Sequence, residues 1–98
     1  MNVRWTNSAL AHLAAIHEHI AHDSPRYAAV MIDRITGRSR QIGEFPLSGQ
    51  SVPEYRDPAI REVIEGPYRV IYEVVGQDVR VLAVIHGARL LPTLPPTA

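Results

Sequence analysis

The spacing of apolar residues changes once along the chain, and this change limits the fold more than any other feature. Before residue 46, apolar side chains recur every three or four positions, as on one face of a helix. After residue 58 they alternate or run together, as in strands. The residues between, 46–58, include three prolines and are typical of a loop. Helices first and strands last predict an α+β domain, in which helices cover a sheet.

The first half of the chain predicts two helices joined by a tight turn. Thr6, Asn7 or Ser8 can cap the first helix, and Ser24 followed by Pro25 marks the start of the second. A turn of two or three residues between two helices makes them an antiparallel hairpin. The apolar stripe of the first helix consists of Ala9, Leu13, Ile16 and Ile20. The second helix is expected to end at Gly43 and Pro46.

The second half predicts three strands, at residues 59–64, 68–75 and 79–85, separated by glycine-containing turns. Residues 2–5 are also prone to form a strand, so the expected order is β-α-α-β-β-β. We therefore predict a helical hairpin packed on one face of a small, mainly antiparallel sheet, with the opposite face open. The 98 residues allow one domain, 1–98, in which the proline-rich residues 90–98 are expected to form a flexible tail.

Composition excludes several classes of protein. The chain has no cysteine, which excludes disulfides, thiolate metal sites and thiol nucleophiles. It shows no apolar stretch long enough for a membrane span and no signal peptide, so a cytoplasmic location is expected. Ten arginines balance ten acidic residues, and lysine is absent. A net charge of zero argues against direct, non-specific binding of duplex DNA, which requires excess positive charge.

Candidate functional residues gather in the strands and just after them. Arg61, Arg69 and Arg89 could together form an anion site for a phosphodiester or an acidic peptide. A single strand arginine is more often solvated or paired with an acid such as Glu62. His86 ends the last strand, where it could transfer a proton near neutral pH or cap the strand. The alternation does not decide which sheet face each side chain occupies.

Histidines are concentrated in the first helix, at His12, His17, His19 and His22. Spacings of three and seven place some of them on one face, which is compatible with a metal site. No carboxylate or cysteine completes a ligand set, so a polar helix face is the preferred interpretation. The sequence also has no nucleotide-binding loop or hydrolase motif, and we expect neither a metal nor another cofactor.

The strand sequences resemble a known family. The stretch REVIEGPYRVIYEV at 61–74, followed by VLAVIHGAR at 81–89, is similar to the RelE/ParE toxin superfamily of bacterial toxin–antitoxin modules. The opening VRWT, the first helix and the loop at 49–54 also match in kind and order. The resemblance implies the fold predicted above and a cognate antitoxin that binds and neutralises the toxin. It further implies that operator DNA is contacted only through the antitoxin.

The superfamily resemblance leaves the target open. ParE-like members poison DNA gyrase, whereas RelE-like and YoeB-like members cut mRNA on the ribosome. A RelE-like site implies basic residues at Arg61, Arg69 and Arg89, but the further basic position expected after Arg61 is Val63 here. The late aromatic residue of RelE-like members is also missing.

A YoeB-like site would use Glu54 as base, Arg69 to clamp the phosphate and His86 as acid, with the histidine shifted by one position. Together with the net charge of zero, the missing positions favour a ParE-like toxin acting on gyrase. The alternatives are a ribosome-dependent mRNA endoribonuclease and an inactive relative that acts as operon co-repressor with its antitoxin.

Overall fold

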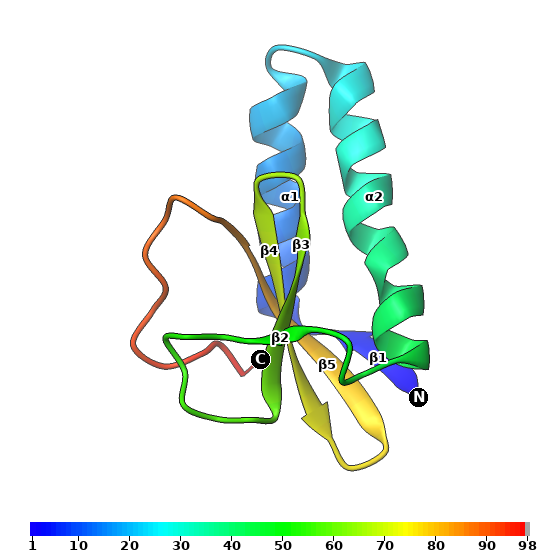
Figure 1. Cartoon of the computed structure of the whole chain (residues 1–98). Coiled ribbons are helices and arrows are strands. Elements are labelled where there is room, and N and C mark those ends of the chain that lie inside the picture. The colour runs from blue at the N-terminus through cyan, green and yellow to red at the C-terminus, as the bar shows by residue number, and fades with distance from the viewer. Residues whose placement is uncertain (98) are drawn as a thin grey trace.

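The computed structural model describes residues 1–97 as two helices and five strands (Figure 1). In chain order these are β1 (Asn2–Trp5), α1 (Asn7–Ala21), α2 (Pro25–Glu44), β2 (Gln50–Ser51), β3 (Ile60–Glu65), β4 (Tyr68–Val75) and β5 (Asp78–His86). The α+β class and the helical hairpin are confirmed. The expected strands agree with β3, β4 and β5 to within one residue at each end. The sequence did not predict β2, which lies inside the expected loop. Neither helix within residues 1–97 is both long enough and apolar enough to cross a membrane.

The helices begin where the sequence predicts. The Thr6 hydroxyl accepts a hydrogen bond from the Ala9 amide at 3.1 Å, and the Ser24 hydroxyl accepts one from the Tyr27 amide at 3.2 Å. Each cap satisfies a backbone N–H that has no partner in the first helical turn. Pro25 occupies the first turn of α2, where its missing N–H costs nothing.

The strands form one sheet in the order β1-β5-β4-β3-β2. All neighbours are antiparallel except β1 and β5, which run parallel from Asn2↔Asp78 to Trp5↔Val81. The first and last strands are therefore adjacent, as the blue and orange-yellow arrows of Figure 1 show. Because β1 is much shorter than β5, the pairing between them stops at Val81.

One face of the sheet packs against both helices. The alternation in β4 is confirmed, because Tyr68, Val70, Tyr72 and Val74 all belong to this core. Their helical partners are Ala9, Leu13, Met31, Ile35 and Ile42. Tyr72 is fully buried, and its hydroxyl donates to the Pro46 carbonyl and accepts from the Gly49 amide. A Cβ at Gly49 would lie 2.4 Å from that hydroxyl, so this position requires glycine.

The opposite face is not open, which corrects the expectation from sequence. A second apolar cluster forms there from Val52, Tyr55, Ile60, Ile71 and Ala83, with Ile85 and Leu91 packed against it. The chain reaches this face twice, through the loop after β2 and through the C-terminal tail. The second cluster therefore joins segments that are far apart in sequence.

The C-terminal tail, for which the sequence predicts flexibility, contacts the loop after β2 and strand β5. The Tyr55 hydroxyl donates to the Pro92 carbonyl at 2.9 Å, and Arg80 donates to the Thr97 carbonyl. In Figure 1 the orange-to-red tail accordingly returns beside the green loop. Apolar packing of Leu91 adds to these bonds. Residue 98, the last of the expected tail, lies outside the described residues.

Candidate functional site

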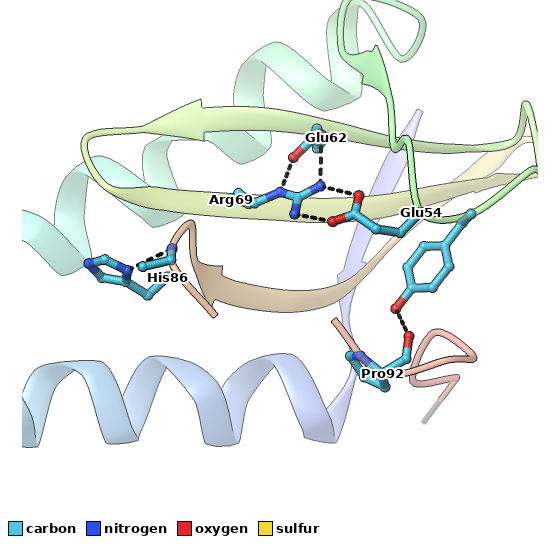
Figure 2. Close-up of polar contacts among 7 residues, drawn as sticks. Glu54, Glu62, Arg69, His86 and Pro92 are labelled. Atoms are coloured by element: carbon cyan, nitrogen blue, oxygen red, sulfur yellow. Dashed lines mark hydrogen bonds and ion pairs between the residues drawn. The ribbon is translucent and has the colours of Figure 1, made fainter. Parts of the chain in front are cut away.

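Arg69 lies between two carboxylates on the face of the sheet away from the helices (Figure 2). Its Nε donates to Glu62 Oε1 at 2.6 Å, and its Nη2 donates to Glu62 Oε2 at 3.1 Å. Its two terminal nitrogens also donate to the two oxygens of Glu54, at 2.8 and 2.9 Å. The guanidinium therefore makes a two-bond contact with each carboxylate, the strongest geometry for this pair of groups.

The strands explain how this group is assembled. Glu62 pairs with Ile71, and Ile64 pairs with Arg69, so Glu62 and Arg69 lie diagonally across β3 and β4 on one face. Glu54 reaches the same place from the loop after β2. The Arg69 and Glu62 side chains are only 13% and 8% exposed, whereas Glu54 is 43% exposed.

The charges of this cluster, Glu54–Arg69–Glu62, sum to −1 with both acids ionised. The hydrogen bonds from Arg69 lower the pKa of the Glu54 carboxyl to about 2, so Glu54 is ionised at neutral pH. The same two acids raise the pKa of Arg69. A carboxylate held in this way is a weak base. A phosphate approaching Arg69 would meet a net negative group and would have to displace Glu54.

Arg61 does not join Arg69. It pairs with Tyr72 across β3 and β4, which places it on the helix-facing side of the sheet. Its Nη1 donates to the Gly49 carbonyl at 3.0 Å. Its Nε is buried and has no hydrogen-bond partner within residues 1–97. Arg61 therefore supports the loop before β2, and the structure does not bring it together with Arg69.

His86 and Arg89 lie near each other but away from the Glu54–Arg69–Glu62 cluster. His86 pairs with Tyr68 across β5 and β4, and the two rings meet edge to face with centroids 5.6 Å apart. Figure 2 shows the His86 ring pointing away from Arg69 and Glu54. Its Nδ1 accepts the Ala88 amide at 3.1 Å, so it caps the turn after β5. Of the proposed trio Glu54, Arg69 and His86, only the first two are in contact.

The structure reveals one site that the sequence analysis missed, a cavity of about 250 Å³ between α1 and the end of β5. His12, His19, His86 and Arg89 line it. His12 is half-buried, and burial lowers its pKa. Its Nδ1 accepts the Val84 amide at 3.1 Å, a donor left free because β1 ends before this part of β5. In the sequence, the shortness of the opening strand was the signal that part of β5 would lack a strand partner.

The helix histidines do not form a metal site in the part of the chain that the structure describes. No group of three histidine, cysteine, aspartate or glutamate residues among residues 1–97 is placed to hold a metal ion. His17, within α1, and His22, the residue that caps its C-terminus, are both exposed and do not line the cavity.

Comparisons with known proteins agree on one family. Residues 3–91 match the family described as "ParE toxin of type II toxin-antitoxin system, parDE". Toxin RelE2 of Caulobacter vibrioides is 34% identical over 90% of this chain and 97% of its own. The protein Y4kP of Sinorhizobium fredii is 30% identical over 92% of each chain.

Two solved structures share the fold. A chain from the chromosomal ParDE system of P. aeruginosa superposes with a TM-score of 0.74 at 24% identity, over 88% of this chain and 95% of that one. A chain from the toxin–antitoxin complex RelBE2 of Mycobacterium tuberculosis gives a TM-score of 0.60 at 22% identity, over 87% and 88%.

Proposed function

The chain belongs to the ParE toxin family of type II toxin–antitoxin systems, and from this premise we propose that it arrests growth by poisoning DNA gyrase. A cognate antitoxin encoded beside it would bind the toxin and relieve the arrest. The kinship of both similar structures to toxin–antitoxin systems supports such a partner. A gyrase poison needs a binding surface but no proton transfer of its own.

One observation supports gyrase over mRNA as the target, namely the saturation of Arg69 by Glu54 and Glu62. Self-cleavage of RNA needs a base for the 2′-hydroxyl, a cation for the phosphate and an acid for the leaving oxygen. Here the candidate cation is neutralised, and the candidate acid His86 points elsewhere. The chain also has no net positive charge with which to attract RNA.

The test runs two assays on one preparation of the purified toxin. We expect it to block DNA supercoiling by gyrase and to trap cleaved DNA, while a message translated on ribosomes stays intact. Cuts in the translated message with normal gyrase activity would replace this proposal with a ribosome-dependent endoribonuclease. Absence of both activities would instead leave an inactive relative that represses its operon together with the antitoxin.

Glu54→Gln sharpens the distinction, because an amide cannot act as a base. A ribonuclease that uses Glu54 would lose about 100- to 10,000-fold in cleavage rate. Toxicity through gyrase should change by less than about tenfold. Co-purification with the product of the neighbouring gene provides the control that each variant is folded and binds its antitoxin, whether or not it is still toxic.

A further inference from the structure

The cavity between α1 and the end of β5 is built to present hydrogen-bond donors. In both His12 and His86, Nδ1 accepts a backbone N–H, from Val84 and Ala88 respectively. The proton of a neutral imidazole must then sit on Nε2. Both rings therefore have a donor at Nε2 whether they are neutral or charged. No acceptor for either Nε2 lies among residues 1–97.

Arg89 adds the charge that the two rings lack. Within the described chain its guanidinium has no carboxylate partner, and no acidic residue lines the cavity. This contrasts with Arg69, whose positive charge is neutralised by Glu54 and Glu62. A ligand that offers only acceptors and a negative charge would complete all three groups.

We propose that this cavity receives a single aspartate or glutamate side chain of the antitoxin, with its carboxylate among His12, His86 and Arg89. That the carboxylate comes from an antitoxin rests on the function proposed above, whereas the binding of a carboxylate in this cavity does not. Apart from His19, the remaining walls are mainly apolar and include Ile16, Val84 and Tyr68. They suit the methylene groups of an amino-acid side chain.

A phosphate of a nucleic acid fits these observations less well. The cavity holds about 250 Å³, which suits a side chain better than a sugar-phosphate backbone. A chain of zero net charge also gains little from counterion release. The favoured ligand is therefore a carboxylate of a protein, and phosphate is the competing outcome of the test.

The first experiment uses the labelled full-length toxin alone, with sodium acetate and sodium phosphate as probes at constant ionic strength. Imidazole nitrogen signals are followed by NMR near pH 7.5. We expect saturable shifts of His12 and His86 with acetate, and none for the exposed His17 and His22, which do not line the cavity. Tighter binding of phosphate than of acetate would overturn the assignment, as would equal shifts of all four histidines.

Two matched variants test the role of charge. Arg89→Gln should weaken acetate binding at least tenfold while leaving the histidine signals dispersed, as in a folded chain. Arg56→Gln, on the exposed loop that serves the opposite face, should change it less than twofold. Unchanged binding in Arg89→Gln would overturn the proposal.

The second experiment measures dissociation of the toxin from the product of its neighbouring gene. Arg89→Gln should speed dissociation at least tenfold, and Arg56→Gln less than twofold. Pairing Arg89→Gln with neutral substitutions of each antitoxin acid should identify one carboxylate whose loss adds nothing further. If the wild-type proteins form no complex, the proposed function fails while the acetate titration still decides the carboxylate site. A stable complex that is indifferent to Arg89→Gln would overturn this inference alone.

Discussion

Arg69 and Arg89 stand close to the same end of the sheet, yet their surroundings differ completely. Arg69 is 13% exposed and makes four hydrogen bonds to two carboxylates. Arg89 is exposed, lines the cavity together with three histidines, and meets no acid within residues 1–97. The comparison teaches that an arginine near a strand end is available to a partner only if the chain's own acids leave it free. The charge of Arg69 is used in ion pairs within the fold, whereas the charge of Arg89 is available to the carboxylate that we propose binds there.

The largest predicted effect removes the buried cation. Arg69→Met leaves Glu62 buried without its partner, which we expect to cost about 3–5 kcal/mol in the free energy of unfolding. Urea denaturation measures this loss. The double variant Arg69→Met with Glu62→Met should recover much of it, because no buried unpaired charge then remains and Glu54 is 43% exposed to solvent. A single variant within 1 kcal/mol of wild type would show that this pair does not hold the fold.

A smaller loss of stability is expected from a change at His12, which lines the cavity. His12→Leu removes the acceptor of the Val84 amide at the unpaired edge of β5, at an expected cost of about 1 kcal/mol. Faster hydrogen exchange at Val84 should accompany the loss. His17→Leu, on the outer surface of the same helix, is the matched control and should change neither measurement.

Acid should weaken the Glu54–Arg69 contact by a smaller amount. The folded pKa of Glu54 lies near 2, below its ordinary value of 4.5. This contribution is therefore complete above about pH 4.5 and is lost as the pH falls toward 2. Since Glu54 is 43% exposed, solvent screening keeps the effect below about 1 kcal/mol. Melting curves between pH 2 and 5 should show a shallower decline for Glu54→Gln than for wild type.

The smallest expected effect on stability is that of Arg89→Gln. Because no carboxylate partner is lost, the free energy of unfolding should stay within about 0.5 kcal/mol of wild type. Measured by urea denaturation, Arg69→Met and Arg89→Gln should then give the largest and the smallest loss of stability for two arginines near the same end of the sheet. A loss above 2 kcal/mol would mean that Arg89 has a structural partner after all.

Local signals predicted most of the fold. Ser24 with Pro25 started the second helix as expected, and the alternation from Tyr68 to Val74 identified the helix-facing side of β4. The second apolar cluster could not be predicted this way, because it depends on where a proline-rich loop and the tail return. Leu91 in a tail that was expected to be flexible shows the difficulty, since its packing involves residues distant in sequence.

The candidate site was less predictable than the fold, because it depends on which face of the sheet each side chain occupies and on which residues it meets there. Glu62 was recognised as a possible partner for a strand arginine, and it binds Arg69. That Arg61 and Arg69 lie on opposite faces could be seen only from the strand register, in which Arg61 pairs with Tyr72 and Arg69 pairs with Ile64. The role of His12 could not be predicted without knowing that β1 leaves part of β5 unpaired. This depends on the pairing of two strands that are far apart in sequence.

The parallel pairing of β1 with β5 also constrains how the protein is made. Asn2 is synthesised well before its partner Asp78, because 75 residues separate them in the sequence. Strand β1 therefore stays unpaired until β5 has been synthesised, and the pairing then closes a long loop, a slow kind of step.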